Sequence, residues 1–322
     1  MKGYLCLLLV SAVAAYLDPL SDEFLDRINS RETTWKAGRN FPEGTAMDTL
    51  RRLVGVLSDP EGFQLPLRES KIPEAFEIPF SFDAREQWPD CPSIFEIRDQ
   101  GNCGSCWAVA AVSVMSDRAC IHSQGQENFR YSDENLLACC NTCGLGCNGG
   151  LLSPAFNYWV NHGIVSGGTY GSNEGCQSYS IPPSGYYKYT PTPDCQLQCH
   201  PDHGVNYEDD LRFGLTAYRL YPNVTEIQYE VMINGPVEVS FHVFEDFYSY
   251  TSGVYQHVEG SFTGEHAVRL IGWGEEAGTP YWLIANSWNA TWGDNGYFKI
   301  LRGVNECLIE INPHGGIPKP LA

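Results

Sequence analysis

The segment from Gln100 to Trp107, with the sequence QGNCGSCW, constrains the fold of this 322-residue chain more than any other stretch. Small residues precede Cys106, and the apolar residues after it recur with helical spacing, at Trp107, Ala110, Ala111 and Val114. This pattern predicts a helix that begins near Cys106. The amino-terminal end of a helix carries partial positive charge, which favours a thiolate over a thiol. Cys106 is therefore a candidate nucleophile.

The spacing of Cys103 and Cys106 alone leaves other roles open. A Cys-x-x-Cys pair can be a redox couple, half of a zinc site or two structural cysteines. A redox couple normally follows a strand in a thioredoxin-like unit, which the surrounding sequence does not suggest. The five residues Cys103-Gly104-Ser105-Cys106-Trp107 match the Cys-Gly-Ser/Ala-Cys-Trp/Tyr pattern around the nucleophile of papain-type proteases.

Two later segments supply the partners that this pattern requires. His266 heads an apolar segment that runs to Trp273, and Asn286 lies in the sequence YWLIANSW. They follow Cys106 by 160 and 180 residues, more than the roughly 130–150 typical of the family, which indicates a longer middle. On these residues the chain resembles papain-family cysteine proteases and, within them, cathepsin B. The resemblance extends from about Leu20 to Pro318.

The resemblance implies a role for each residue of the site. Cys106 would be the nucleophile, and His266 would be its base and the cation that stabilises the thiolate. Asn286 would orient the imidazole, and Trp288 would shield that contact from water. Gln100 would donate its side-chain amide to the developing oxyanion, together with the backbone N–H of Cys106. The residues expected to contact substrate are Gly149, Gly150, Ala267, Trp288 and Asn312.

The hydrophobic periods predict an α+β protein. Helices are expected after Cys106, from Ser132 to near Cys139, from Ser153-Pro154 to Gly163, and from a Thr225 cap to Asn234. Strands are expected at 237–243, 266–273, 281–286 and 296–301. Helices come first and strands second, which favours a helical lobe and a sheet lobe. The resemblance implies a papain-like two-lobe fold, with an antiparallel β-barrel-like lobe and the active site in the cleft between the lobes.

The N-terminal part of the chain has the features of a secreted precursor. Residues 1–15 are expected to be a signal peptide, because a short apolar run ends in small residues. Residues 16–77 resemble the short propeptide of cathepsin B and include a helix capped by Ser21. In the family this segment crosses the cleft in the reverse direction, with a small-residue turn that corresponds to Val54-Gly55. Residues 78–322 would be the mature peptidase domain.

Thirteen cysteines favour an oxidising compartment. The cluster from Cys139 to Cys147 is compatible with zinc, but the secretory signal and the number of cysteines favour disulfides. The resemblance implies the pairs Cys91–Cys120, Cys103–Cys147, Cys139–Cys195, Cys140–Cys143 and Cys176–Cys199. Cys106 and Cys307 would then be free thiols in the mature part.

The net charge of −19 argues against nucleic acid or an anionic membrane as a partner. We expect no cofactor, no metal and no membrane span. The expected partners are polypeptide substrates, the chain's own propeptide as inhibitor, and cystatin-type inhibitors, with the protein itself a monomer. The expected location is the secretory pathway, a lysosome-like acidic vacuole or the extracellular space. Asn223 and Asn289 head glycosylation sequons.

Two departures from cathepsin B affect the expected specificity. After Ile181-Pro182-Pro183 the chain continues Ser184-Gly185-Tyr186-Tyr187, so the loop that blocks one end of the cleft is shorter and lacks its His-His pair and both loop cysteines. Asn312 replaces a glutamate at the base of the main specificity pocket. We therefore predict a cysteine endopeptidase, secreted as a zymogen and acting through an acyl-enzyme, with weak or absent dipeptidyl-carboxypeptidase activity.

Two other function classes compete with this prediction. The first is a non-catalytic binding or adhesion protein on the same fold, but such relatives lose the nucleophile, which is present here as Cys106. The second is a disulfide-rich zinc-binding module, which would carry stoichiometric metal.

Overall fold

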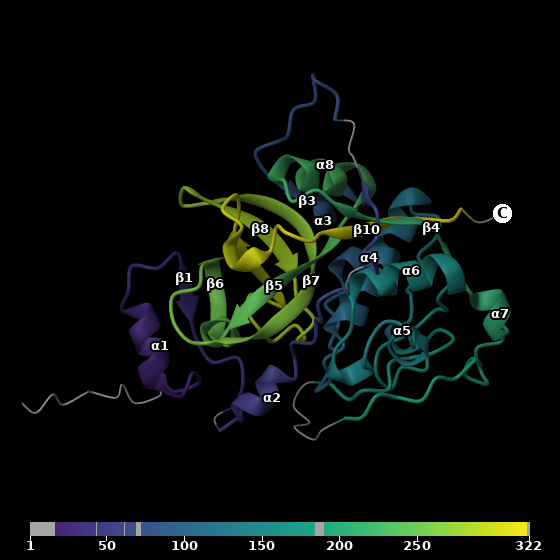
Figure 1. Cartoon of the computed structure of the whole chain (residues 1–322), viewed down its shortest axis with the longest axis horizontal. Coiled ribbons are helices and arrows are strands. Elements are labelled where there is room, and N and C mark those ends of the chain that lie inside the picture. Colours follow the sequence, from purple (N-terminus) through teal and green to yellow (C-terminus); the bar gives the residue numbers. More distant parts are fainter. Residues whose placement is uncertain (1–16, 43, 61, 69–71, 184–189, 321–322) are drawn as a thin grey trace, which may run out of the picture.

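The computed structural model describes residues 17–42, 44–60, 62–68, 72–183 and 190–320. The expected signal peptide and Tyr186-Tyr187 lie outside the described residues. Within these ranges no helix is long and apolar enough to cross a membrane. A sheet lobe and a helical lobe lie side by side (Figure 1). This arrangement confirms the predicted α+β class and two-lobe fold.

The sheet lobe is built on one long sheet with the strand order β1-β6-β9-β8-β7-β5-β10-β4-β2, and β3 pairs with β7. The strands are β1 (Trp35–Ala37), β2 (Leu67–Arg68), β3 (Phe82–Asp83), β4 (Gly214–Leu220), β5 (Val237–Phe244), β6 (Tyr250–Tyr255), β7 (Phe262–Glu276), β8 (Thr279–Ala285), β9 (Tyr297–Leu301) and β10 (His314–Pro318). The pairings are antiparallel except β6 with β9 and β2 with β4, which are parallel. Both terminal strands of the path, β1 and β2, come from the segment before residue 78.

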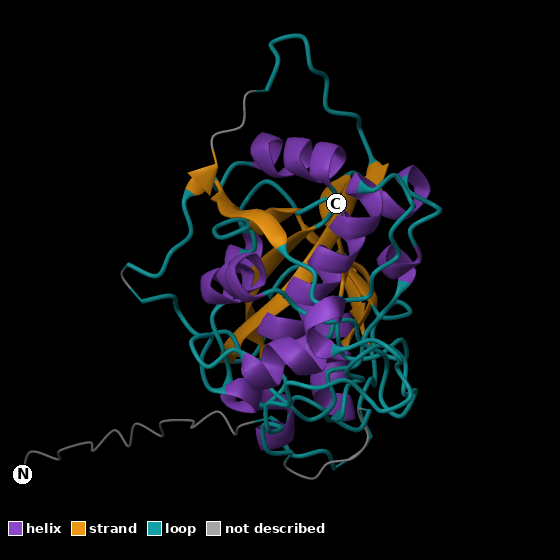
Figure 2. Cartoon of the chain, turned by 90° about the vertical axis from the view of Figure 1, so that its right-hand side faces the viewer, coloured by secondary structure: helices purple, strands orange, loops and turns teal. Residues whose placement is uncertain are grey.

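The helical lobe lies in front of the strands in Figure 2, with long loops gathered at one end. The α-helices of the chain are α1 (Asp22–Asn29), α2 (Met47–Arg51), α3 (Ala84–Gln87), α4 (Cys106–His122), α5 (Asp133–Cys139), α6 (Leu152–His162), α7 (Tyr207–Asp210) and α8 (Val224–Asn234). Short 3₁₀ turns are η1 (Pro92–Phe95), η2 (Gly146–Asn148), η3 (Glu245–Ser249) and η4 (Glu306–Leu308).

The observed helix-capping residues agree in part with those predicted from the sequence. Ser21 caps α1 by accepting a hydrogen bond from the Phe24 backbone N–H, and Ser132 caps α5, as predicted. The predicted Thr225 cap is wrong. Asn223 caps α8, and its side-chain oxygen accepts from the backbone N–H groups of Thr225 and Glu226, because an Asn before the first helical residue competes well for that position. The third helix, α6, begins slightly before the predicted Ser153-Pro154, at Leu152.

Helix α4 is buried over its first fifteen residues, from Cys106 to Cys120. Two of its charged residues, Asp117 and Arg118, have no exposed surface. Such burial is tolerated only where the charges are paired. Asp117 accepts two hydrogen bonds from Nη1 of Arg269 in β7, at 2.9 and 2.8 Å. Arg269 also donates to backbone carbonyls of Ser93 and Glu96. This ion pair joins the central helix to the central strand across the two lobes.

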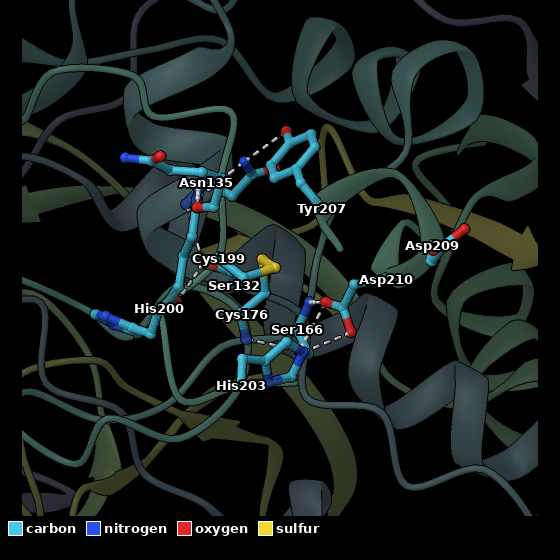
Figure 3. The surroundings of a disulfide bond; sticks show 12 residues. Ser132, Asn135, Ser166, Cys176, Cys199, His200, His203, Tyr207, Asp209 and Asp210 are labelled. Atoms are coloured by element: carbon cyan, nitrogen blue, oxygen red, sulfur yellow. Dashed lines mark hydrogen bonds and ion pairs between the residues drawn. A yellow bond between two sulfur atoms is a disulfide. The ribbon is translucent and has the colours of Figure 1, made fainter. Parts of the chain in front are cut away.

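Five disulfides hold the loops of the helical lobe and its border with the sheet lobe. The structure joins Cys91–Cys120, Cys103–Cys147, Cys139–Cys195, Cys140–Cys143 and Cys176–Cys199, the five pairs that the resemblance implies. Figure 3 shows the last of these beside Asp210, whose carboxylate accepts from the Ser166 backbone N–H (2.6 Å) and hydroxyl (2.7 Å). His203 lies 3.1 Å from the other oxygen of Asp210. Polar contacts therefore reinforce the disulfide where regular structure is sparse.

We predict that Asp117→Asn destabilises the protein strongly, because it leaves the Arg269 cation buried without its carboxylate. Breaking one partner of a buried ion pair costs about 3–5 kcal/mol. Urea denaturation followed by tryptophan fluorescence measures the loss. The control is Asp48→Ala, since Asp48 forms an exposed pair with Arg51 and should change stability by less than about 1 kcal/mol. Equal effects of the two substitutions would show that the inter-lobe pair is not essential.

Candidate active site

Cys106 is the first residue of α4 and has no exposed surface. Its side chain packs in a small apolar cluster with Ala110, Leu152 and Ala267, the last of which directly follows His266 in β7. The backbone N–H of Gly55 donates to the Cys106 sulfur at 3.3 Å. The thiol therefore lies at the contact of the two lobes, covered by the chain segment before residue 78.

His266 and Asn286 form the second part of the site. Nε2 of His266 is 2.8 Å from Oδ1 of Asn286, and the same Oδ1 accepts the Ser287 backbone N–H at 2.8 Å. Because Oδ1 is an acceptor in both contacts, Nε2 of His266 must carry the proton. This leaves Nδ1 of a neutral ring as the proton acceptor, and Nδ1 has no hydrogen-bond partner among the described residues.

Trp288 covers this histidine. Its ring stacks on the imidazole of His266 with centroids 4.7 Å apart, and it is 1% exposed. Phe41, from the segment before residue 78, packs edge-on against the same tryptophan at 6.3 Å. The hydrogen bond between His266 and Asn286 is thus kept out of water, as the resemblance implies for Trp288.

Hydrogen bonds at both the oxygen and the nitrogen of its side-chain amide fix the position of Gln100. Its Oε1 accepts a 2.6 Å hydrogen bond from the Ser287 hydroxyl, and its Nε2 donates to the carbonyls of Cys103 (2.7 Å) and Leu53 (2.9 Å). The Leu53 carbonyl belongs to the segment before residue 78. A donor held in this way beside the thiol is suited to stabilise negative charge on a substrate oxygen.

Residues 55–57 lie along Gly149 and Gly150, two of the residues expected to contact substrate. The backbone N–H of Gly150 donates to the Gly55 carbonyl at 2.8 Å, and the N–H of Leu57 donates to the Gly150 carbonyl at 2.8 Å. The bridge between Val56 and Gly150 is parallel. A Cβ on Gly55 would lie 2.1 Å from the Gly104 carbonyl oxygen, and a Cβ on Gly150 would lie 2.4 Å from the Trp107 ring. Glycine is therefore required on both sides of this contact.

Burial holds the thiol and the imidazole in their neutral forms in this state. It raises the pKa of Cys106 to about 12, although backbone N–H groups of Ala267 and Gly55 favour the thiolate. It lowers the pKa of His266 to about 4, although the hydrogen bond to Asn286 favours the charged ring. Desolvation disfavours the charged form of each group. Between these two pKa values the covered site holds a thiol and a neutral imidazole.

Asn312 lies in the wall of a cavity of about 300 Å³ beside the cleft. Leu152, Leu308 and Ile311 share this wall, and Leu57 of the N-terminal segment reaches into the same cavity. Polar and charged side chains, among them Arg219, His242 and Glu265, line the rest of the cavity. Asn312 itself stands where cathepsin B has a glutamate. Gly149 and Ala267 lie at the edge of the same region, beside Gly55 and Cys106 respectively.

Sequence reasoning missed two residues near the site. Ser287 orients Gln100, and its position between Asn286 and Trp288 in the NSW motif was the available signal. Glu238 of β5 is completely buried, and neither carboxylate oxygen has a hydrogen-bond partner among the described residues. Burial, together with the neighbouring Asp59, raises its pKa well above the usual range. Glu238 alternates with Val237 and Val239 along β5, but both faces of this strand are covered.

The two sequons differ in exposure. Asn223 is exposed, and its side-chain oxygen is used for the cap of α8, which leaves its nitrogen free of that contact. Asn289 is partly buried, and its side-chain oxygen accepts from the backbone and hydroxyl of Thr291 at 2.8 and 2.5 Å.

Comparison with known proteins places this site in a family. A family model described as papain family cysteine protease matches residues 78–317, and one described as peptidase family C1 propeptide matches residues 20–60. Cathepsin B-like cysteine proteinase 5 of Caenorhabditis elegans is 43% identical over 340 residues, covering 97% of this chain and 96% of the relative. Cathepsin B-like cysteine proteinase 6 of the same organism is 44% identical over 327 residues, covering 96% and 86%.

Solved structures show the same likeness. The procathepsin B S9 structure from Trypanosoma congolense superimposes with a TM-score of 0.85 at 38% identity, covering 94% of this chain and all of that chain. A digestive procathepsin L2 from Tenebrio molitor larval midgut gives a TM-score of 0.72 at 25% identity, covering 92% and 89%.

We predict that removal of residues up to 77 makes Cys106 reactive toward iodoacetamide at pH 6. In the intact chain the thiol is covered and its pKa is about 12, whereas paired thiols in papain itself have pKa values of about 3–4. Mass spectrometry of the alkylated peptide gives the rate. Cys307, a second free thiol that is partly buried, is the internal control and should react equally in both forms. Equal rates for Cys106 before and after removal would contradict the prediction.

Proposed function

Because this chain belongs to the papain family of cysteine peptidases, as a cathepsin B-like member, we propose that it is a secreted zymogen of an endopeptidase with Cys106 as nucleophile. The observation that carries the proposal is the Leu53 carbonyl held by Gln100, in a cleft where Gly55 contacts the thiol. The N-terminal segment of the chain thus already contacts the groups that a peptide substrate would need. A non-catalytic binding role is not favoured by any feature of this site.

The proposed reaction proceeds in two steps through a thioester. With the cleft open, the Cys106 thiolate attacks the substrate carbonyl carbon, and Gln100 with the Cys106 backbone N–H stabilises the oxyanion. The C–N bond breaks as Nδ1 of the His266 imidazolium gives its proton to the leaving amine. Water then attacks the thioester with His266 as base, which releases the acid and regenerates the thiol. Asn286 keeps the imidazole in the tautomer that both steps need.

We propose that residues 16–77 are the propeptide and inhibit residues 78–322. The segment 53–57 covers the thiol and contacts the proposed oxyanion donor, and its bridge to Gly150 is parallel. A second contact fixes its other end, because Glu259 pairs with both Arg27 and Arg31 of α1 and its flank. Exclusion of substrate follows from occupation of the cleft.

Residues 1–15 would direct the chain into the secretory pathway, with a lysosome-like acidic vacuole or the extracellular space as its destination. Asn223 is the better placed of the two sequons for glycosylation, because it is exposed at the start of α8. Substrates would be polypeptides, with the cavity beside Asn312 receiving a side chain.

We predict that Cys106→Ala lowers kcat/KM on a fluorogenic peptide by a factor of about 10⁴ or more. His266→Ala should be comparably severe, because residues that act as a unit lose their effect together. The matched control is Cys307→Ala, which removes the other free thiol of the described chain and should leave the rate unchanged. A tenth of the wild-type rate remaining in the Cys106 variant would rule out this nucleophile.

We predict that Asn312→Glu raises the preference for arginine over leucine in the main specificity pocket about tenfold. A neutral amide accepts a hydrogen bond from a guanidinium, whereas a carboxylate forms a charge-assisted bond about twice as strong. The ratio of kcat/KM for two fluorogenic peptides that differ only at this residue gives the preference. Asn312→Gln controls for side-chain length. An unchanged ratio in the glutamate variant would place the arginine pocket elsewhere.

We predict that the mature protein cuts long peptides internally and removes few C-terminal dipeptides. In cathepsin B a His-His pair binds the terminal carboxylate of the substrate, and here Tyr186 and Tyr187 occupy the corresponding sequence positions. A phenol with a pKa of about 10 offers a hydrogen bond without a positive charge at acid pH. A long peptide blocked at its N-terminus, followed by mass spectrometry, should show internal cuts first. A ladder that shortens by two residues from the C-terminus would refute this.

A further inference from the structure

Residues 62–68, with the sequence GFQLPLR, form a second contact of the N-terminal segment with the peptidase domain. They lie between the two matched ranges, which end at residue 60 and begin at residue 78. They also lie beyond the cleft contacts of residues 53–57. This piece of the chain therefore has its own binding surface, which the cleft does not explain.

The backbone of this piece extends the sheet. Strand β2 pairs in parallel with β4, with Leu67 opposite Arg219 and Arg68 opposite Leu220. The Arg219 backbone N–H donates to the Pro66 carbonyl at 2.9 Å, and its Nε donates to the Leu65 carbonyl at 3.0 Å. Addition of a strand to a sheet edge is a recurrent mode of peptide recognition.

Arg68 reaches a buried carboxylate. Its Nη1 lies 3.3 Å from Oε2 of Glu230, whose side chain is 1% exposed, and its guanidinium carbon lies 4.5 Å above the Tyr218 ring. Glu230 has further partners from the peptidase domain: Arg118 at 2.9 Å, the Tyr218 hydroxyl at 2.5 Å and Asn234 at 2.9 Å. The carboxylate therefore stays buried and oriented without Arg68, so the site is preorganised for a second cation.

Leu65 provides an apolar anchor three residues before the arginine. It is 9% exposed and belongs to the core cluster of the helical lobe, with Trp107 and Phe156. Its neighbours Gly62 to Pro66 line a cavity of about 530 Å³ against Pro154, Asn157 and His162 of α6. The surface thus offers an apolar contact for Leu65, a strand edge and a buried negative charge.

We propose that this surface is an exosite of the mature peptidase, which binds an extended polypeptide segment with leucine three residues before arginine. The proposal rests on the proposed maturation, because removal of the propeptide takes away β2 and leaves β4 as the sheet edge. The occupant is a segment of a polypeptide substrate with the chemistry of residues 62–68. Binding of this segment outside the cleft would hold a long substrate near Cys106. The cleavage of short peptides, which do not reach the exosite, would be unaffected.

The test uses the full-length chain with the segment undocked by the double substitution Leu65→Asp and Arg68→Ala. A fluorescein-labelled, acetylated peptide of residues 62–68 is titrated, and its fluorescence anisotropy is measured. The peptide should bind the double variant and bind the wild-type chain at least tenfold more weakly, because there the site is occupied. The peptide with alanine in place of Arg68 should bind the double variant about tenfold more weakly, and a scrambled peptide should not bind. Charge-assisted hydrogen bonds to a buried partner account for a difference of this size.

The protein side of the contact has a matched pair of variants. Arg219→Ala, placed in the double variant, removes the side-chain contact to the Leu65 carbonyl and should weaken peptide binding several-fold. Arg212→Ala removes a half-buried arginine of the same lobe that contacts Glu127 and should have no effect. Absence of binding to the double variant, or equal binding of the arginine and alanine peptides, would overturn the exosite.

A second measurement covers the case in which the double variant fails to fold. In the wild-type chain after processing, the peptide should slow cleavage of a long polypeptide that carries the Leu-x-x-Arg segment and leave a short fluorogenic substrate unaffected. Inhibition of the short substrate would show a cleft ligand and overturn the proposal. The anisotropy experiment needs no peptidase activity, so failure of the exosite and failure of the proposed catalysis are distinguished.

Discussion

The buried ion pair between Asp117 and Arg269 is the contact on which the placement of the two lobes depends. Asp117 belongs to the helix that begins with Cys106, and Arg269 belongs to the strand that carries His266. The pair therefore fixes the two halves of the site relative to each other. Its desolvation is offset by the two hydrogen bonds from Nη1 of Arg269 to Asp117 and by those from Arg269 to the carbonyls of Ser93 and Glu96. The thiol at a helix start and the imidazole on a strand therefore belong to two elements that this ion pair joins directly.

The N-terminal segment uses the same groups that the proposed reaction uses. Leu53 offers a carbonyl to the Gln100 amide, and Gly55 approaches the thiol so closely that a side chain would meet the Gly104 carbonyl. Covering the site also removes water from Cys106 and His266, which shifts both pKa values toward the neutral forms. The proposed inhibition would thus be both steric and electrostatic, and removal of a single segment would relieve both effects.

Much of this arrangement could be predicted from the sequence, because it depends on short contiguous sequence patterns. The helix start at Cys106, the strand with His266 and the NSW motif each predict their local structure, and the family resemblance supplies the disulfide pairs. Contacts between residues far apart in the sequence were harder to predict. Glu238 alternates with valines as an exposed residue would, yet the structure buries it because both faces of β5 are covered. Strand β2 has two residues, too few for a period, so its parallel pairing with β4 depends on tertiary contacts alone. The α8 cap was misplaced because two capping residues, Asn223 and Thr225, compete within one turn.

The central claim is that Cys106 is the group acylated during peptide hydrolysis. The most direct measurement is an acid quench of the processed protein during turnover of an activated ester, followed by peptide mapping with mass spectrometry. The account predicts one acyl group per protein molecule, attached to the peptide that contains Cys106, and its disappearance on dilution into buffer. An acyl group on Cys307 or on a hydroxyl, or turnover without any trapped acyl-enzyme, would contradict the account.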